Sequence, residues 1–335
     1  MTAEILPTHT PALFAVAVQR AAERLRAGEV VALPTETVYG LAANALDEKA
    51  VARIFQIKGR PANNPIIVHV ADMDLAKRCV AVWPPLADKM ARAFWPGPLT
   101  LVLPRTREVP DIVVAGGTTV GVRWPAHPFI QAVIQECGFP LAAPSANLSG
   151  QISPTNAEHV QRQLGGRIPL IVDGGQAQVG IESTVLDLTV SPSRVLRPGM
   201  IHAESLAAVG ENLEPRTGRR QEGPFRSPGL LPKHYSPKAK LVVLRWRDEF
   251  DLRAQLSARN APLATTFVIA HTHIPAAGDW AVVSVIPHDA EAFARAIYAE
   301  LHRCDAKGAE WIVVEALPET PAWAGIADRL RRAAA

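Results

Sequence analysis

Two cationic residues, Lys58 and Arg60, flank a glycine at the start of the segment 58–70, KGRPANNPIIVHV. Arginine presents a planar fork that fits phosphate or carboxylate, and lysine adds a compact charge. The glycine between them lets the backbone approach a ligand closely. His69 stands among the aliphatic residues that follow. This pattern indicates anion binding, although a single Lys-x-Arg is more often an exposed basic turn.

Two loops of small polar residues, 34–40 and 143–150, each follow an apolar run that reads as a strand. Polar side chains at the carboxyl end of a strand favour a ligand site. Capping of a helix, or an Asx or Ser turn, would account for the same residues. The polar residues of the two loops are Thr35, Glu36, Thr37 and Tyr39, and Ser145, Asn147 and Ser149.

Three further segments contribute charged or hydroxyl side chains near strands. Arg123 lies in an otherwise apolar strand, so its burial would require an anionic partner. A structural ion pair and a bound ligand would both meet that requirement. Residues 182–184 are Glu-Ser-Thr at the opening of another strand, and Arg197 stands at a strand end.

Several familiar catalytic motifs are excluded. The segment 175–182 has the glycine spacing of a P-loop, but Ile181 and Glu182 replace the required lysine and Ser/Thr. The sequence has no HExxH, no GxSxG, and no GxGxxG after a strand. Its histidines lack metal-ligand spacing, and its three cysteines form no CxxC, which disfavours a zinc site or a disulfide framework.

The overall composition is that of a globular α/β protein. The chain has 335 residues, of which 48% are hydrophobic and 20% charged, and its formal net charge is +3. That length suggests about two domains. The weak positive charge permits a polyanionic ligand without requiring nucleic acid. The sequence shows neither a secretory signal nor a membrane-spanning run, so we expect a cytoplasmic protein.

Hydrophobic periodicity and turn residues position these candidates on alternating elements. We expect an α/β domain with a large sheet over 1–212, a Pro/Gly-rich basic linker over 213–240, and a small α/β domain over 241–335. In the first domain we expect helices over 12–28, 47–59, 84–97, 129–136 and 158–164, and strands over 29–34, 65–70, 99–104, 119–125, 139–145, 169–175, 183–189 and 193–199. In the last we expect strands over 240–246, 265–272, 280–287 and 309–318, and helices over 289–308 and 325–335.

Seven segments together resemble, in their order, the YrdC-like family of threonylcarbamoyl-AMP synthases. The resemblance covers nearly the whole chain and implies the two-domain form of that family. The implied fold is a twisted, mixed open sheet with helices, followed by a small Rossmann-like α/β domain. The segments are PTETVYGL, KGRPANNPIIVHV, WPGPLTLVL, VGVRWPAHP, APSANLSG, IESTVLDL and VLRPG.

The resemblance implies a nucleotidyltransferase that converts L-threonine, bicarbonate (or CO₂) and ATP to threonylcarbamoyl-AMP, pyrophosphate and water. Mg²⁺ accompanies the ATP and is held mainly by its phosphates rather than by protein side chains. A separate transferase complex then moves the threonylcarbamoyl group to tRNA. The linker is expected to act as a lid over the active site.

The resemblance also assigns residues to the ligands. The signature Lys58, Arg60, Ser145 and Asn147 is assigned to catalysis, with Lys58 and Asn147 near the phosphates and the new carboxylate. The threonine-binding residues are Thr37, His69, Arg123, the backbone around Ala143, and Ser183. The ATP-binding residues are Arg60, Asn64, Thr119, Ser145, Ser153, Arg197 and, from the linker, Tyr235.

No residue stands out in the sequence as a general base. We therefore expect the threonine amine to lose its proton to bicarbonate or water. A different class of function, an RNA-binding protein with a basic concave sheet that binds tRNA, is the alternative. The low net charge and the lack of an aromatic stacking platform argue against it. Carbamoyl transfer from carbamoyl phosphate would need zinc-finger segments, which the sequence does not show.

Overall fold

The computed structural model describes residues 2–210, 213–214, 226–229, 233–276 and 278–335. The chain divides into two compact units. The N-terminal unit comprises residues 1–149 and 153–230, and the C-terminal unit comprises 150–152 and 231–335. Much of the predicted linker, 213–240, lies outside the described residues, and its described end, 233–240, belongs to the C-terminal unit.

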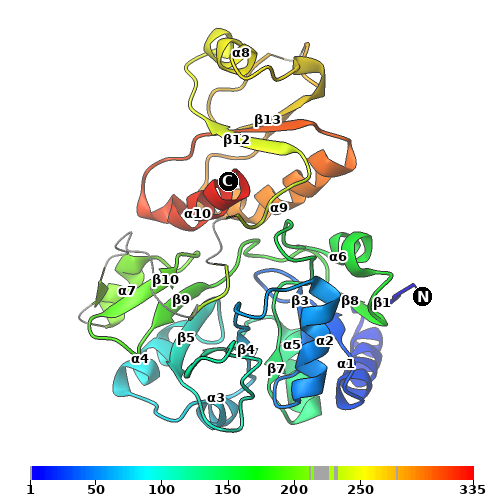
Figure 1. Ribbon diagram of the computed structural model, residues 1–335, viewed down its shortest axis with the longest axis vertical. Helices are drawn as coiled ribbons and strands as arrows, with labels where there is room; N and C mark the ends of the chain where they lie inside the picture. Colours follow the sequence, from blue (N-terminus) through cyan, green and yellow to red (C-terminus); the bar gives the residue numbers. More distant parts are fainter. Residues whose placement is uncertain (1, 211–212, 215–225, 230–232, 277) are drawn as a thin grey trace. The chain divides into compact units, whose positions relative to one another are not determined.

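The N-terminal unit is built on a mixed sheet of eleven strands within the described residues (Figure 1). Parallel and antiparallel neighbours alternate irregularly along it, which confirms the expected mixed α/β fold. In spatial order the strands are β1 (Glu4–Pro7), β8 (Leu170–Asp173), β2 (Val31–Leu33), β3 (Gly40–Asn44), β7 (Leu141–Ala142), β4 (Val68–His69), β6 (Thr119–Arg123), β5 (Leu99–Pro104), β9 (Thr184–Asp187), β10 (Ser193–Arg197) and β11 (Leu213–Glu214).

The helices of this unit begin and end at residues that the sequence marks. Thr10 and Asp47 cap two of them by accepting backbone N–H groups, and Gly59 ends the second in the left-handed conformation, φ 58°. The cationic turn thus begins where a helix stops. The helices are α1 (Pro11–Arg26), α2 (Glu48–Lys58), α3 (Met73–Cys79), α4 (Pro85–Phe94), α5 (Pro128–Cys137), α6 (Ala157–Leu164) and α7 (Ala203–Val209).

The two faces of the sheet pack against different helices. On one face, α1 and α5 lie side by side and pack on strand residues that include Val31, Ala42 and Leu141 (Figure 1). The opposite face packs against α2 and α4 through residues such as Val68 and Val122. Because side chains alternate between faces along a strand, His69 and Arg123 share the face of Leu141.

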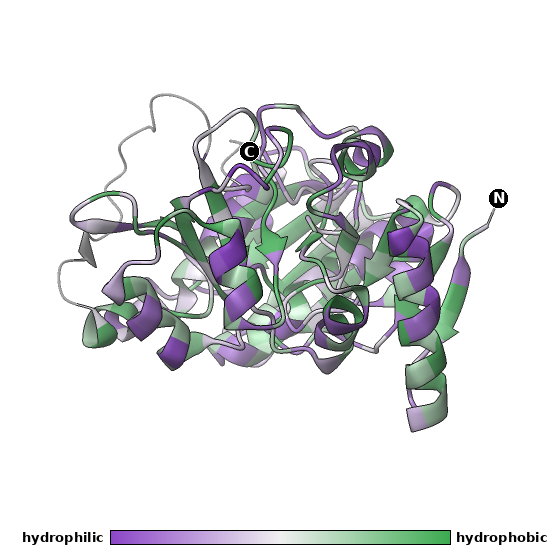
Figure 2. Cartoon of the chain, turned by 90° about the horizontal axis from the view of Figure 1, so that it is seen from below, coloured by the Kyte–Doolittle hydropathy of each residue, from purple (hydrophilic) through white to green (hydrophobic). Residues whose placement is uncertain are grey.

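Within its described residues, the C-terminal unit is a four-stranded sheet of parallel strands with helices, as expected for a Rossmann-like piece. Its strand order is β12 (Lys240–Leu244), β15 (Trp311–Glu315), β13 (Thr266–Ala270) and β14 (Val282–Val285). Its helices are α8 (Glu249–Ser257), α9 (Ala290–Ala306), α10 (Ala324–Ala333) and the short 3₁₀ turns Leu263–Thr265 and Pro321–Trp323. In the N-terminal unit, the strands are mostly hydrophobic, and the helices carry both polar and apolar residues (Figure 2).

Each predicted element has a counterpart, but several observed elements have no prediction. These are β1, β3, β11, α3, α7, α8 and the two 3₁₀ turns. Strand β3 is rich in small residues, GLAAN, and carries little β-propensity of its own. Its pairing with β2 and β7 establishes it as a strand. No helix among the described residues is long and apolar enough to span a bilayer.

Candidate active site

Four polar side chains meet on one face of the sheet, from β4, β6 and β5 and from the residue immediately before β9. His69 and Arg123 are register partners on the neighbouring parallel strands β4 and β6. Thr100 on β5 lies on the same face as Arg123. Its neighbour Leu101 pairs with Val122 on the other face, and side chains alternate between faces along a strand. The hydroxyls of Thr100 and Ser183 are 2.8 Å apart. This face of the sheet is apolar where α1 and α5 cover it. It carries polar side chains from strand β4 to the start of β9.

Arg123 is the hub of this group. Its Nη1 donates to the Thr37 hydroxyl at 2.9 Å and its Nε donates to the carbonyl of Gly97 at 3.2 Å. Its Nη2 lies 2.7 Å from Oε1 of Glu36. Both ion-pair partners are buried. The anionic partner that the sequence required for a buried Arg123 is thus Glu36, from the loop between β2 and β3.

The loop that carries Thr37 is held by its own polar residues. Thr35 donates to the carbonyl of Val38 at 2.6 Å and contacts the Thr37 hydroxyl at 3.0 Å. Tyr39 donates to the carbonyl of Gly175 at 2.7 Å, and burial raises the pKa of its phenol. Thr35 and Tyr39 therefore support the loop, although Thr35 caps no helix among the described residues, and Glu36 and Thr37 face Arg123.

His69 is held as a neutral imidazole. Burial, assisted by the positive charge of Arg123, lowers its pKa to about 3. Within the described residues, its Nδ1 has no hydrogen-bond partner. Buried polar atoms of native proteins are nearly always hydrogen-bonded, so an unsatisfied one calls for an explanation. A ligand on this sheet face would supply the missing partner.

Ser183 joins the Arg123 group to a second buried arginine. Arg197, at the end of β10, donates through Nε to the carbonyl of Ser183 and through Nη2 to its hydroxyl, both at 3.1 Å. The residues predicted for threonine (Ser183) and for ATP (Arg197) are therefore direct neighbours. This contact is the point where the two predicted ligand sites meet.

Lys58 is committed to the loop 143–150. Its ammonium donates to the carbonyls of Ser145 at 2.5 Å and Asn147 at 2.6 Å, and lies 3.3 Å from the side-chain oxygen of Asn147. Burial, followed by the charge of Arg60, lowers the pKa of Lys58 well below its ordinary value. Three of the four signature residues thus form one unit, in which Lys58 positions the loop of Ser145 and Asn147.

Arg60, the fourth signature residue, folds back over the turn that follows it. Its Nε donates to the carbonyl of Asn64 at 3.0 Å and its Nη2 to that of Pro65 at 2.6 Å. The side-chain amide of Asn64 is buried, and its Nδ2 donor has no hydrogen-bond partner among the described residues. Asn64 therefore offers a donor to a ligand, and Nδ1 of His69 is a second buried polar atom without a hydrogen-bond partner among the described residues.

The remaining predicted residues lie in different surroundings. Ser153 is buried and donates to Glu182 at 2.5 Å. Thr119 is half-buried at the other end of β6 from Arg123, on the same face. The backbone N–H of Ala143 donates a hydrogen bond to the carbonyl of Ile67 at 3.2 Å.

Tyr235 belongs to the C-terminal unit. There it is buried, with φ 63°, and its ring centroid lies 6.0 Å from that of Tyr298. The guanidinium carbon of Arg329 lies 5.5 Å from its ring centroid. Its predicted contact with ATP stays a prediction.

Two features of the site escaped sequence reasoning. Thr100 reads as an ordinary member of the apolar run 99–104, and only its register shows that it faces Ser183. Gly121 lies between Thr119 and Arg123, and a Cβ there would lie 3.1 Å from Thr100 Cγ2. A threonine among aliphatic strand residues, and a glycine within a strand, were the available signals.

The fold and site define a class: an α/β protein with a mixed open sheet and a buried, cation-rich group of side chains on one sheet face. Two family models match the chain. Residues 23–199 match the Sua5/YciO/YrdC family, described as telomere recombination. Residues 201–335 match the model described as the C-terminal domain of threonylcarbamoyl-AMP synthase.

Full-length relatives agree with the family models. Threonylcarbamoyl-AMP synthase from Pyrococcus abyssi is 39% identical over 93% of this chain and 92% of its own. The Bacillus subtilis enzyme of that name is 40% identical over 95% and 92%. The structure of P. abyssi Sua5 complexed with L-threonine aligns with a TM-score of 0.89 at 36% identity, over 100% of this chain and 98% of that one. The chain belongs to the threonylcarbamoyl-AMP synthase family.

Proposed function

We propose that this protein forms L-threonylcarbamoyl-AMP, with pyrophosphate and water, from L-threonine, bicarbonate or CO₂, and ATP. The observation that carries the proposal is the buried group in which Arg123 bonds Thr37 and pairs in register with His69. It combines a cation for a carboxylate with hydroxyl and imidazole groups for a small polar side chain. The homologues are named for this reaction, and the solved relative was crystallised with L-threonine.

In this proposal, the threonine site selects its ligand through hydrogen bonds. Thr37, His69 and Ser183 are the candidates for pairing with the threonine hydroxyl, and the neutral imidazole offers both a donor and an acceptor. A pocket that commits buried polar groups to a hydroxyl rejects valine, because valine would leave those groups unpaired.

ATP would lie toward Arg197, Arg60 and Asn64. The carbamate oxygen formed on threonine attacks the α-phosphorus, and pyrophosphate leaves. Negative charge therefore collects in one small volume, and fixed cations lower the barrier by stabilising it. The contact between Ser183 and Arg197 supports this arrangement, because the carbamate and the α-phosphate must meet between the two sites.

We propose that Mg²⁺ accompanies ATP and is held mainly by the nucleotide's phosphates, whose charge it would neutralise. The side chains around the predicted nucleotide residues fit this arrangement. Arg60 and Arg197 are buried guanidinium cations, which would repel a metal ion that was not already bound to phosphate. The product would pass to a separate transferase complex that modifies tRNA in the cytoplasm, and Tyr235 would contribute to ATP binding.

The test is incubation of the protein with ATP, Mg²⁺, bicarbonate and each amino acid in turn, with detection by mass spectrometry. We expect an aminoacyl-carbamoyl adenylate with threonine, together with one pyrophosphate per adenylate. Omitting bicarbonate should abolish it. Failure to form the adenylate, or equal product with valine, would contradict the proposal.

A further inference from the structure

Glu36 and Arg123 form an ion pair with unused hydrogen-bonding capacity on both sides. Nη2 of Arg123 lies 2.7 Å from Oε1 of Glu36, and their side chains are only 4% and 9% exposed. The contact is close enough for charge pairing, but its angles are not those of a hydrogen bond. Within the described residues, neither oxygen of Glu36 has a hydrogen-bond partner, and neither has Nη2 of Arg123.

A buried ion pair whose polar atoms lack hydrogen bonds is unfavourable unless a further group, such as a ligand, bonds to those atoms. Burying a carboxylate and a guanidinium is costly unless hydrogen bonds satisfy their remaining lone pairs and protons. Here the acceptors lacking hydrogen bonds are on the anion and the donor lacking one is on the cation. A ligand that satisfies both must carry an anionic acceptor and a cationic donor close together. The zwitterion of an α-amino acid has this chemistry.

We propose that Glu36 binds the ammonium group of the amino acid substrate and accepts its proton. This inference rests on the proposed function and assigns a role that the sequence left to bicarbonate or water. The substrate carboxylate takes the place of Glu36 at Arg123, and its ammonium pairs with Glu36. One buried ion pair becomes two, so no charge is left unpaired. The Glu36–Arg123 pair thus holds the site in a substrate-like arrangement before threonine binds.

The proton transfer completes the chemistry of the amine. A proton moves from the ammonium nitrogen to a carboxylate oxygen of Glu36, which leaves a neutral amine and a neutral carboxyl. The nitrogen lone pair then attacks the carbon of bicarbonate. The C–N bond forms, the second proton of the amine passes to the leaving hydroxyl as a C–O bond breaks, and water leaves, giving the N-carboxylate. The proton on Glu36 is released to solvent after the adenylate forms, which restores the carboxylate for the next turnover.

Neighbouring groups are compatible with this role. Glu36 presents its backbone carbonyl to the N–H of Val179 at 2.7 Å, which fixes its position in the loop. The adjacent Thr37 bonds Arg123, so the loop places a carboxylate and a hydroxyl beside the same guanidinium. The hydroxyl, ammonium and carboxylate of threonine would then each meet a group of complementary chemistry.

The experiment is calorimetric titration of wild-type and Glu36→Gln full-length protein with two ligands. One is L-threonine, and the other is (R)-3-hydroxybutanoate, which keeps the carboxylate and hydroxyl but lacks the ammonium. Glu36→Gln should weaken threonine binding by about 10- to 100-fold, the effect of losing a charged hydrogen bond. It should leave hydroxybutanoate binding unchanged or strengthen it, because Arg123 loses a competing carboxylate.

Two outcomes would overturn the inference. Equal losses for both ligands would mean that Glu36 only positions Arg123, and unchanged threonine binding would mean that it has no role. Wild-type protein gives a test that does not depend on folding of the variant: it should prefer threonine to hydroxybutanoate by at least about 10-fold, and equal affinities would refute ammonium binding.

The catalytic part has its own measurement. At saturating threonine, Glu36→Gln should lower kcat by about 10²- to 10⁴-fold, as expected for loss of a general base. A change in KM alone would exclude proton transfer. Asp187→Asn is the matched control, because Asp187 is a buried carboxylate that pairs instead with Arg226. If wild type makes no adenylate, the proposed function fails. If wild type makes it and Glu36→Gln matches wild type, only this inference fails.

Discussion

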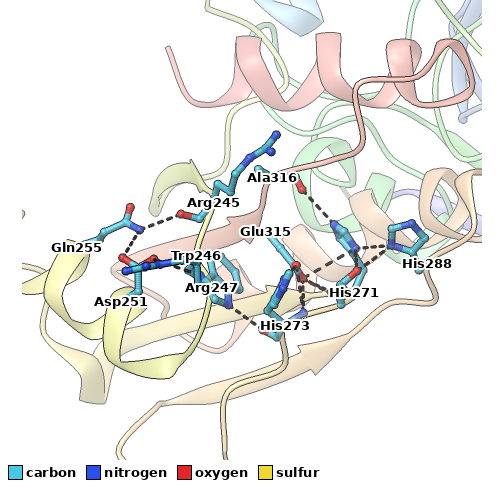
Figure 3. Close-up of polar contacts among 11 residues, drawn as sticks. Arg245, Trp246, Arg247, Asp251, Gln255, His271, His273, His288, Glu315 and Ala316 are labelled. Carbon is cyan, nitrogen blue, oxygen red and sulfur yellow. Dashed lines mark hydrogen bonds and ion pairs between the residues drawn. The ribbon is translucent and has the colours of Figure 1, made fainter.

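Each unit of the molecule buries a glutamate, and the two carboxylates lie in opposite surroundings. Glu315, at the end of β15 in the C-terminal unit, accepts from the backbone N–H groups of His271, Thr272 and His273 at 2.8, 2.9 and 3.1 Å. It also contacts Nδ1 of His273 at 2.7 Å (Figure 3). Burial alone would raise the pKa of Glu315, but these hydrogen bonds hold the pKa below its ordinary value. The carboxylate of Glu36 in the N-terminal unit has an ion pair but accepts no hydrogen bond among the described residues.

The difference separates a structural carboxylate from one that is prepared for a ligand. Glu315 ties the segment after β13 to the end of β15, and its acceptors are fully used inside the protein. Both carboxylate oxygens of Glu36 lack hydrogen bonds within the described residues, and in our proposal the substrate ammonium supplies them. Buried polar atoms that lack hydrogen bonds therefore indicate the site more specifically than burial or charge alone.

The largest expected effect comes from removing the cation beside Glu36. Arg123→Met should lower kcat/KM for threonine by about 100-fold or more and lower the free energy of unfolding by about 3–5 kcal/mol, because it leaves Glu36 buried without its charge partner. Urea unfolding and steady-state kinetics measure the two losses.

A double variant sharpens this result. Adding Glu36→Gln to Arg123→Met removes the unpaired charge, so about 2 kcal/mol of stability should return while activity stays low. Strictly additive destabilisation would show that the two residues do not form an energetic pair.

In the C-terminal unit, Glu315→Gln should act on stability alone. The amide presents a donor to backbone N–H groups that now donate to a carboxylate, so the free energy of unfolding should fall by about 2–3 kcal/mol. Calorimetric titration should find threonine affinity unchanged from wild type. A weakened affinity would erase the proposed contrast between the two glutamates.

His69→Ala should weaken threonine binding by about tenfold and ATP binding by much less, because the imidazole is assigned to the threonine hydroxyl. Titration with each ligand separately gives the comparison, and Ser153→Ala serves as the reciprocal variant on the ATP side. Equal losses of both ligands in His69→Ala would remove His69 from the threonine site.

The last expected effect is a pH dependence of stability in the N-terminal unit. The pKa of His69 is about 3 in the folded protein and near its ordinary value when unfolded. Below the ordinary value the unfolded chain binds the extra proton, so stability is full above about pH 6.5 and falls as pH drops toward 3. The slope is about 1.4 kcal/mol per pH unit. Urea unfolding between about pH 5 and 7 should show it in wild type. His69→Phe should reduce the slope, and the remainder comes from groups such as His127, whose pKa burial also lowers.

The sequence by itself determined which residue types the site contains. The cationic turn, the two small polar loops, Arg123 and Arg197 were visible as anion-binding chemistry, and the order of seven segments indicated the family. Long apolar runs such as 99–104 and 240–246 fixed most strands, because burial of a strand depends on its local hydrophobic pattern.

Only the tertiary structure decided how those residues are paired. Glu36 and Arg123 are far apart in sequence, and so are Thr100 and Ser183 and the neighbours Lys58 and Ser145. Strand β3 exists because β2 and β7 hydrogen-bond it, not because of its own propensity. The physical reason is that contacts across the sheet depend on register, and a one-residue slip would turn His69 and Arg123 to the opposite face. Local sequence patterns do not specify that register, so the roles of Glu36 and Lys58 appeared only with the fold.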